Sequence, residues 1–370
     1  MVYEPQEDSF LLKEFVKRFA KGVVLDMGTG SGLQAREASH SARTSKVFAV
    51  DIDKEAIAYC KKYNDHKRHK KVKWLVGDLF SPVKNKFDTV IFNPPYLPQD
   101  HKTRDIALEG GKKGNEVIAR FLDEVNDYLK PDGIILLVFS SLTPGVKEIL
   151  DRNMLVGREL GRTHMFFEDI FVYLIKKNPI LKKLERKGVS QIKFLARGKR
   201  GVVFTGKLKG KKVAVKVKRP SSTAVGTISH EAKMLKFLNK HKIGPRYLFH
   251  SSLFLVYVFV EGVYLRDLIK SKKLKSVCKK VFEQCFVLDS LKVNKQEMTR
   301  PYKHVIVKGD KVTLIDFERA RRTDSPHNVT QFCTFVMNHV DKDKAKWIKL
   351  ARMYSKTPSK AVFRLIVRSL

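Results

Sequence analysis

The chain has 370 residues, of which 43% are hydrophobic, so it is long enough for two domains that each bury a core. Its apolar runs are too short to cross a bilayer, and acidic residues stand where a signal peptide would avoid them, which excludes a membrane protein and favours the cytoplasm. Four cysteines without C-x-x-C spacing predict neither a zinc site nor a disulfide framework. The net charge is +36: residues 1–180 hold 29 Lys and Arg against 25 Asp and Glu, and residues 181–370 hold 45 against 13.

The first half alternates strand-like and helix-like segments. Apolar spacing predicts helices over residues 8–19 and 54–62, and buried strands over residues 23–25, 47–50, 73–76, 89–92 and 134–139, with further β-rich pieces at residues 165–175. Strands that alternate with helices predict an α/β domain with a mostly parallel, doubly wound sheet. We place this domain at residues 1–178 and a basic connecting helix at residues 179–187.

The first predicted strand runs into a glycine-rich turn with the spacing D-x-G-x-G-x-G, which begins at Asp26 and includes Gly28 and Gly30. Glycines let a backbone pass close to a ligand, and the helix that follows offers free N–H groups. A dinucleotide site would favour G-x-G-x-x-G. The observed spacing instead resembles the first motif of class I methyltransferases, whose cofactor is S-adenosylmethionine. The acid before the glycines suits the cationic amino acid end of that cofactor.

Two further acids follow predicted strands. Asp51 is placed to accept hydrogen bonds from ribose hydroxyls, and Asp78 to accept from the adenine amino group. Ligands of open α/β sheets collect at the carboxyl ends of the strands, so we expect both acids to converge with the glycine turn.

The tetrapeptide Asn93-Pro94-Pro95-Tyr96 follows the strand at residues 89–92. The Asn93 side-chain oxygen and the Pro94 carbonyl can accept hydrogen bonds from an NH2 group, and the Tyr96 ring can stack on a planar amide or base. Catalysis would then be orientation and electrostatics, without an added acid or base. The motif predicts methylation of a planar NH2, and adenine and a glutamine amide satisfy it equally.

Residues 2–12, the glycine turn, Asp51, Asp78, N-P-P-Y with Leu97-Pro98, and the G-G-x-x-G segment at residues 110–116 together resemble the HemK family of glutamine-N5 methyltransferases, in particular its archaeal and eukaryotic branch. The resemblance implies that the substrate is the glutamine of the GGQ loop of a peptide-chain release factor. Some eukaryotic relatives are linked to lysine methylation, which leaves a second protein substrate open. It also implies a small zinc-binding activator subunit. It implies cofactor contacts from Ser9, Asp26, Gly28, Asp51, Asp78 and Leu79, and substrate contacts from residues 93–96.

The second half begins with short strands at residues 192–196, 202–207 and 213–217, followed by a helix at residues 228–239 and a strand at residues 253–260. Residues 188–340 resemble the small atypical protein kinases of archaea, of the RIO and Bud32 type. The resemblance implies an α+β protein-kinase-like domain over residues 188–370 that binds ATP and Mg²⁺. It assigns Gly198 and Gly201 to a phosphate-covering loop, Lys216 to the α/β-phosphates, Glu231 to a pair with Lys216, residues 258–262 to the adenine pocket, and Asp316 to the metal.

This half departs from the kinase pattern because no H-R-D is present. Glu297 is the candidate for the catalytic acid position and His304 for the metal-binding Asn position, but a neutral imidazole is a poor magnesium ligand. The sequence therefore favours nucleotide binding over fast phosphoryl transfer, and serine/threonine kinase activity stays open.

The excess of positive charge in the second half attracts polyanions, so RNA or the ribosome is an expected partner. This charge also keeps an alternative function open: an N6-adenine methyltransferase of RNA or DNA, with the second half as a nucleic-acid-binding pseudokinase module.

Overall fold

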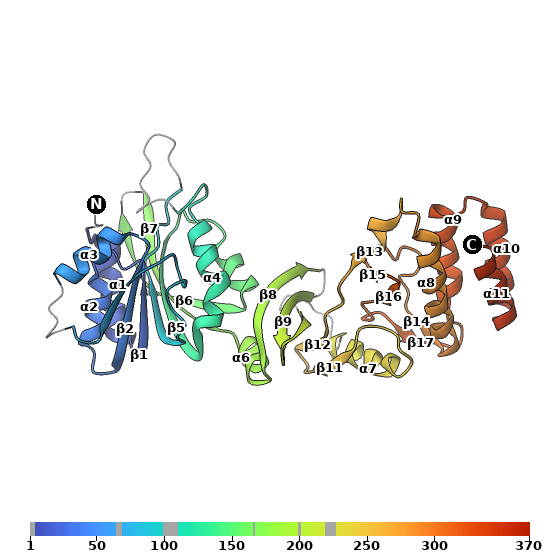
Figure 1. Cartoon of the computed structure of the whole chain (residues 1–370), viewed down its shortest axis with the longest axis horizontal. Helices are drawn as coiled ribbons and strands as arrows, with labels where there is room; N and C mark the ends of the chain where they lie inside the picture. The colour runs from blue at the N-terminus through green and yellow to red at the C-terminus, as the bar shows by residue number, and fades with distance from the viewer. Residues whose placement is uncertain (1–3, 64–68, 99–109, 166, 199–200, 219–226) are drawn as a thin grey trace. The chain divides into compact units, whose positions relative to one another are not determined.

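The computed structural model describes residues 4–63, 69–98, 110–165, 167–198, 201–218 and 227–370 (Figure 1). It divides into two compact units, Met1–Phe194 and Leu195–Leu370, and the division falls inside a strand, β8 (Val189–Arg197). The predicted motif residues 2 and 3 lie outside the described part of the chain, as do residues 199 and 200 of the second glycine-rich turn.

The first unit is built on a seven-stranded sheet with the order β3-β2-β1-β4-β5-β7-β6. Its strands are β1 (Gly22–Met27), β2 (Thr44–Asp51), β3 (Val72–Val76), β4 (Phe87–Phe92), β5 (Leu129–Ser140), β6 (Leu155–Met165) and β7 (Glu168–Lys177). The first five pair in parallel, and β7 and β6 add an antiparallel hairpin beside β5. The predicted parallel sheet is confirmed, and its order reverses at β1, which makes the carboxyl ends of β1 and β4 a place where ligands collect.

Helices cover both faces of this sheet. They are α1 (Glu7–Phe19), α2 (Leu33–His40), α3 (Lys54–Lys62), α4 (Glu116–Tyr128), α5 (Val146–Arg152) and α6 (Pro179–Arg186). Val24 of β1 packs with α1, α2 and α3 in one buried cluster, whereas its neighbour Leu25 packs with α4 and α5 in another. Successive strand residues point to opposite faces, so one apolar run supplies both cores. This is a class I, Rossmann-like methyltransferase fold.

The second unit opens with an antiparallel five-stranded sheet, in the order β11-β12-β10-β9-β8. The strands after β8 are β9 (Gly201–Leu208), β10 (Lys211–Lys218), β11 (Tyr247–His250) and β12 (Phe254–Val258), and the helix α7 (Thr227–Asn239) precedes β11. The predicted short strands and the helix are therefore present, and the pairing of β9, β10 and β12 is antiparallel as expected. The kinase-like identity of this arrangement remains a prediction.

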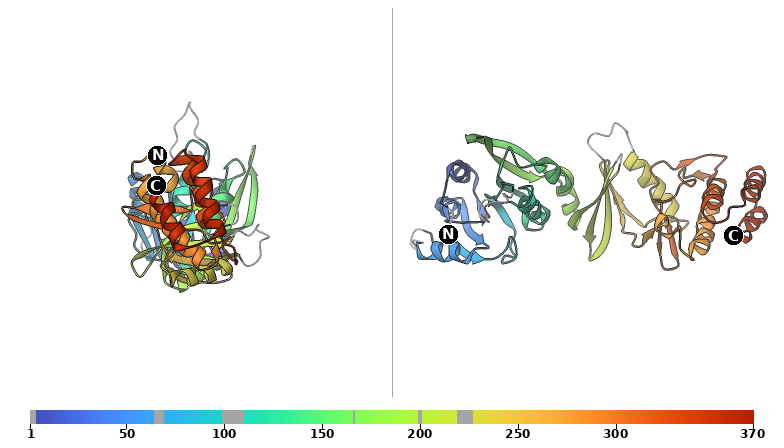
Figure 2. Two further views of the ribbon diagram at one scale, coloured as in Figure 1. Left: turned by 90° about the vertical axis from the view of Figure 1, so that its right-hand side faces the viewer. Right: turned by 90° about the horizontal axis from the view of Figure 1, so that it is seen from above.

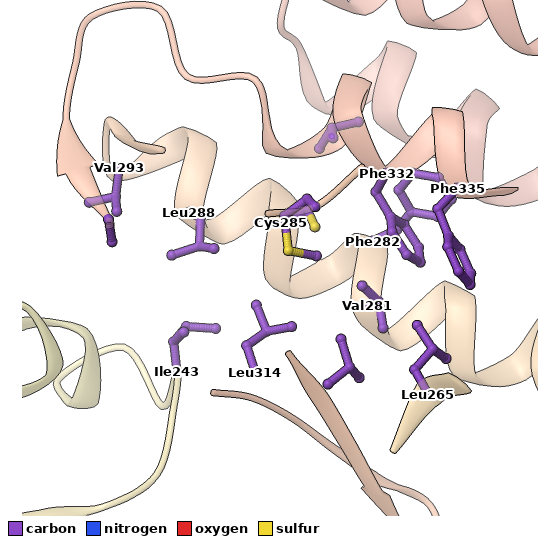
Figure 3. Packing of buried hydrophobic residues seen from close by; sticks show 14 of the residues in the cluster. Ile243, Leu265, Val281, Phe282, Cys285, Leu288, Val293, Leu314, Phe332 and Phe335 are labelled. Carbon is purple, nitrogen blue, oxygen red and sulfur yellow. The ribbon is translucent and has the colours of Figure 1, made fainter. Parts of the chain in front are cut away.

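The rest of the second unit is mainly helical. Its elements are β13 (Val263–Tyr264), the 3-10 helix η1 (Leu265–Leu268), α8 (Leu274–Ser290), β14 (Val293–Asn294), β15 (Val305–Lys308), β16 (Lys311–Leu314), β17 (Arg321–Arg322), α9 (Asn328–His339), α10 (Lys344–Lys356) and α11 (Lys360–Arg368). The red helices α9, α10 and α11 lie side by side (Figure 2). Phe282 of α8 meets Phe332 of α9 edge-on inside the core, with Leu314 of β16 nearby (Figure 3). Within the described residues no helix combines the length and the apolar character needed to cross a bilayer.

A fully buried lysine ties α6 to the first unit. The Lys177 Nζ atom, at the end of β7, donates to the Asn126 carbonyl at 2.9 Å, to the Leu129 carbonyl at 2.8 Å and to Glu185 Oε1 at 2.5 Å. Burial lowers the pKa of Lys177, and Glu185 opposes that shift. The helix predicted for this basic segment is present as α6, and its Leu181 and Leu184 are buried.

We predict that Glu185→Ala lowers the free energy of unfolding of the first unit by about 3 kcal/mol, because it leaves a buried ammonium without its carboxylate. Urea unfolding followed by near-UV circular dichroism measures the loss. The exposed neighbour provides the control, since Arg186→Ala should change stability by no more than about 0.5 kcal/mol. Equal stability of the two variants would show that the Lys177–Glu185 ion pair does not stabilise the first unit.

Candidate active site

A cavity of about 800 Å³ lies at the carboxyl ends of β1, β2 and β4. All the predicted methyltransferase residues line it: Ser9, Asp26, Gly28, Gly30, Asp51, Asp78, Leu79, Asn93, Pro94, Pro95 and Tyr96. Its size is within the usual range of ligand sites, about 300–1,000 Å³. The parallel sheet explains the convergence, since it ends its adjacent strands at one edge.

The glycine turn places a buried carboxyl group against the cavity. Asp26 accepts a hydrogen bond from the Thr29 hydroxyl at 2.5 Å and is almost fully buried. Burial raises the pKa of Asp26 to about 7, against the opposing effect of Thr29. Gly28 has a positive φ of 61°, and a Cβ there would lie 3.3 Å from the Phe92 ring, so this position favours glycine. A carboxyl group of this kind can hold the ammonium of the cofactor once it is ionised.

The other two acids differ in their surroundings. The Asp51 carboxylate accepts from the Gly30 N–H at 2.8 Å and from the Asp53 N–H at 2.9 Å, which joins β2 to the glycine turn. Burial raises its pKa. Asp78 is half exposed and accepts from the Arg120 guanidinium at 2.5 Å. Arg120 comes from α4 and lines the cavity. Sequence reasoning missed it because only the fold brings α4 to this edge.

The Asn93 side chain is held by a residue that sequence reasoning had not assigned to the site. Its amide nitrogen donates to Asp8 Oδ2 at 2.9 Å, and more weakly to Ser9 Oγ at 3.4 Å. The Tyr96 hydroxyl donates to the same Asp8 oxygen at 3.3 Å. Within the described residues, the buried Asn93 Oδ1 has no hydrogen-bond partner. Asp8 stands in the first turn of α1, where an acid ordinarily serves the helix dipole, so its sequence position gave no separate signal.

The loop that carries Pro95 and Tyr96 rests on a second glycine segment. A Cβ on Gly110 would lie 2.6 Å from the Pro95 carbonyl oxygen, and one on Gly114 would lie 2.5 Å from that of Tyr96. Gly110 also donates its N–H to the Leu97 carbonyl at 2.9 Å. Only glycine allows this approach, so the segment at residues 110–114 fixes the backbone of the N-P-P-Y loop.

The second unit gathers a second set of predicted residues around Lys216 of β10. Its ammonium lies 2.7 Å from Glu231 Oε2, 2.9 Å from Asp316 Oδ1 and 3.1 Å from Glu318 Oε2. Burial alone would lower the pKa of Lys216, but these carboxylates raise it well above its usual value. Glu231 of α7 also accepts from the Phe317 N–H at 3.1 Å, which connects α7 to the segment that carries Asp316.

Acidic oxygens of Glu231, Asp316 and Glu318 lie within 4.8 Å of one another, the spacing of a cation site. Burial opposes ionisation of Asp316, yet Lys216 and Lys295 lower its pKa to about 2. Asp316 adopts a positive φ of 63°, an uncommon conformation for a residue other than glycine. Glu318 was not predicted as part of this group, since its neighbours in the sequence give no sign of it.

Glu297 and His304 lie on either side of a fully buried lysine. Lys295 Nζ donates to the Asp316 carbonyl at 2.7 Å and lies 3.7 Å from Glu297 Oε2. Burial raises the pKa of Glu297. His304 Nδ1 is 3.8 Å from Asp316 Oδ2, and burial together with Lys295 lowers its pKa to about 4. The imidazole is therefore neutral at pH 7. Sequence reasoning did not single out Lys295.

The two predicted loop glycines lie near this group. Gly198 donates its N–H to the Gly201 carbonyl at 2.9 Å. A Cβ on Gly201 would lie 3.6 Å from Lys216 Cε. The structure therefore places Gly201, Glu231 and Asp316 near Lys216, and their roles in binding a nucleotide stay a prediction.

Comparisons with known proteins extend the assignment of the first unit. Residues 7–166 match the family described as the methyltransferase small domain. A Methanocaldococcus jannaschii protein, provisionally named protein N5-glutamine methyltransferase, is 35% identical over 179 residues, which is 46% of this chain and 89% of that protein. The release factor glutamine methyltransferase of Koribacter versatilis is 33% identical over 37% of this chain and 53% of its own length, so the chain spans about half of that enzyme.

Among solved structures, the Mtq2–Trm112 complex of E. cuniculi, described as responsible for methylation of the eRF1 translation termination factor, aligns with 26% identity and a TM-score of 0.39. The alignment covers 48% of this chain and 99% of that chain.

The sheet order, the glycine turn and the strand-end acids define the first unit as an S-adenosylmethionine-dependent methyltransferase. The chain belongs, through this unit, to the HemK-like family of protein glutamine methyltransferases. The glutamine enzymes among the relatives do not favour the adenine alternative.

We predict that the affinity for S-adenosylmethionine depends on pH through Asp26. Below pH 7 the carboxyl group is neutral and must lose its proton to pair with the ammonium of the ligand. The dissociation constant should therefore rise by up to about tenfold for each pH unit below about 7, and stay level above it. Calorimetric titration at several pH values measures this. Asp26→Asn should bind more weakly with a flat profile, and the same slope in that variant would contradict the role.

Proposed function

We propose that the first unit transfers a methyl group to the side-chain amide nitrogen of the glutamine in the GGQ loop of a peptide-chain release factor. The observation that carries the proposal is the buried acceptor Asn93 Oδ1, which has no hydrogen-bond partner among the described residues and belongs to a side chain that lines the cavity. A buried polar atom without a partner is costly, so it is best explained as one that the substrate NH2 satisfies. The family assignment selects a glutamine amide over a base.

The arrangement around Asn93 accounts for the chemistry. The Asp8 carboxylate accepts a hydrogen bond from the Asn93 NH2 group, which leaves Asn93 Oδ1 as an acceptor without a partner among the described residues. Asn93 Oδ1 and the Pro94 carbonyl then accept from the two N–H groups of the substrate amide, and Tyr96 lies against its plane. This holds the nitrogen face toward the methyl group, so that rate comes from orientation.

When bound, S-adenosylmethionine supplies an electrophilic methyl on a sulfonium. Transfer of that methyl to the amide nitrogen would leave the cofactor sulfur as a neutral thioether, with the S–C bonding electrons, and would require the amide nitrogen to lose one proton to solvent. Hydrogen bonds to acceptors such as Asn93 Oδ1 strengthen as positive charge develops on that nitrogen. Asp26, Asp51 and Asp78 would hold the amino acid, ribose and adenine parts of the cofactor.

We predict that Asn93→Ala lowers turnover by at least about a hundredfold with little change in cofactor affinity, because an acceptor aimed at the reacting group is lost. Asp8→Asn should lower turnover by about tenfold or more, since an amide no longer dictates the orientation of Asn93. The exposed Glu7→Gln on the same helix turn is the matched control and should keep wild-type turnover.

The assay is transfer of labelled methyl to a co-expressed release factor, with mass spectrometry of the GGQ peptide. One methyl on the glutamine is expected, and replacement of that glutamine should abolish it. Label in total RNA that persists after this replacement would overturn the proposal in favour of an adenine methyltransferase. Wild-type turnover in Asp8→Asn would remove only the positioning role.

We also propose a small zinc-binding activator subunit as a partner of the first unit. β3 is an edge strand, and apolar side chains are exposed on it and nearby: Val76 at 42%, Ile52 at 63% and Tyr63 at 59%. An edge strand beside exposed apolar groups suits pairing with another chain.

For the second unit we propose a kinase-like nucleotide site that binds ATP with Mg²⁺, and contact with RNA through its positive charge. The Lys216–Glu231 pair on β10 and α7 supports the nucleotide site, because this lysine can hold phosphates while Asp316 and Glu318 hold a cation. His304 is neutral and would be a poor magnesium ligand, and Glu297 is one methylene longer than the aspartate usual at the catalytic position. Both features favour nucleotide binding over fast phosphoryl transfer.

We predict that Lys216→Ala and Asp316→Asn each weaken ATP binding in the presence of Mg²⁺ by at least about tenfold, because each removes a charge that would face phosphate or cation. Titration with a fluorescent ATP analogue measures the affinity. Lys207→Ala, which removes an exposed lysine from the adjacent strand β9, should bind as the wild type does. Unchanged affinity in both test variants would refute the nucleotide site.

A further inference from the structure

A second cavity, of about 720 Å³ and in the second unit, contains no residue of the Lys216 group, but its lining includes residues 258–261 of the segment that the kinase resemblance assigns to the adenine pocket. It is formed by the C-terminal end of α7, the turn that leads into β11, the end of β12 and the hairpin of β15 and β16. The volume is comparable to that of ordinary ligand sites, about 300–1,000 Å³.

The lining of this cavity carries a strong excess of positive charge. Its cationic side chains are Lys236, Lys242, Arg246, Lys308 and Lys311. The carboxylate among the lining residues is that of Glu261, and it pairs with Lys308, which lowers the pKa of Glu261. In the described part of the chain, no ion pair involves any of the other four cations. Four uncompensated positive charges around one hollow repel one another, and an anion would relieve that repulsion.

The turn that carries Lys242 and Arg246 is fixed in place. The Asn239 amide donates to the Ile243 carbonyl at 3.0 Å and to the Pro245 carbonyl at 2.9 Å, and it accepts from the Tyr247 N–H at 2.6 Å. Gly244 adopts a φ of 80°, and a Cβ there would lie 2.7 Å from Leu235. The cations therefore project from a constrained backbone, which lowers the entropy lost on binding.

Two aromatic residues line the same cavity. Tyr247 and Phe259 are half-buried in the lining, and Lys212 Nζ stands 4.2 Å from the centre of the Phe259 ring. The Tyr247 hydroxyl is hydrogen-bonded to His250 at 2.8 Å. Cations for phosphates together with rings for bases are the features by which proteins hold a single nucleic-acid strand.

We propose that this cavity binds a single-stranded segment of RNA, with phosphates against Lys236, Lys242, Arg246 and Lys311 and a base against Tyr247 or Phe259. This inference rests on the proposed contact between the second unit and RNA, and it assigns that contact to this cavity. A single strand fits better than a duplex, because a duplex offers mainly its backbone to a hollow of this size, whereas a single strand can insert a base.

The test is binding of a fluorescein-labelled single-stranded RNA of about twelve nucleotides to the full chain, measured by anisotropy over a range of salt concentrations. The double variant Lys242→Ala/Arg246→Ala should bind at least about tenfold more weakly, and its slope of log affinity against log salt should fall by about 1.4, because two phosphate contacts are lost. Tyr247→Leu should bind about tenfold more weakly with an unchanged slope.

The matched control is Lys275→Ala/Lys279→Ala, which removes the same charge from exposed positions of α8. If this control variant binds RNA as weakly as the cavity variant, the cavity is not the RNA site, although the second unit still contacts RNA. Absence of RNA binding by the wild type would overturn the RNA contact itself. Displacement of the RNA by equimolar mononucleotide would also overturn the proposal, since the occupant would then be a small nucleotide. Methyl transfer by these variants should match the wild type, which separates this test from that of the first unit.

Discussion

The hydrogen bond from the Asn93 amide to the Asp8 carboxylate fixes the orientation of the Asn93 side chain, on which the proposed methyl transfer depends. The two residues are 85 positions apart, and the bond joins the first turn of α1 to the loop after β4. A carboxylate accepts and does not donate, so it fixes which end of the Asn93 amide contacts Asp8. Without that constraint the amide could turn over and present donors to a substrate that also has donors. The methyltransferase geometry depends on this one orientation.

The glycines at residues 110–114 hold the backbone of the N-P-P-Y loop, as Asp8 holds the Asn93 side chain. Gly110 and Gly114 let one loop lie directly against the N-P-P-Y loop, where any side chain would collide with a carbonyl oxygen. The N-P-P-Y loop is therefore held by Asp8 of α1 and by the segment at residues 110–114. Such a site loses little entropy when a substrate binds, which suits a reaction whose rate comes from orientation.

In the second unit the buried lysines are paired, whereas the cations around the second cavity are exposed. Lys216 and Lys295 are buried and each has a carboxylate or carbonyl within hydrogen-bond distance, because an unpaired buried ammonium is very costly. The cations around the second cavity are exposed, so water solvates them and they need no carboxylate partner. The same excess of lysine and arginine thus provides a paired cluster around Asp316 and a free positive surface at the end of α7.

The sequence by itself determined the parallel sheet, the glycine turn and the acids at the strand ends, because hydrophobic periodicity and strand order follow local rules. The resemblance of the second half to atypical kinases named Lys216, Glu231 and Asp316, which the structure places close together. The sequence did not indicate Asp8, Arg120, Glu318 or Lys295, whose neighbours in the chain carry no sign of their contacts. Only the tertiary structure decided these contacts, because hydrogen bonds and ion pairs between distant segments depend on how helices and loops pack on the sheet. In the sequence, an acid in the first turn of a helix looks the same whether it serves the helix dipole or, like Asp8, holds the amide of Asn93.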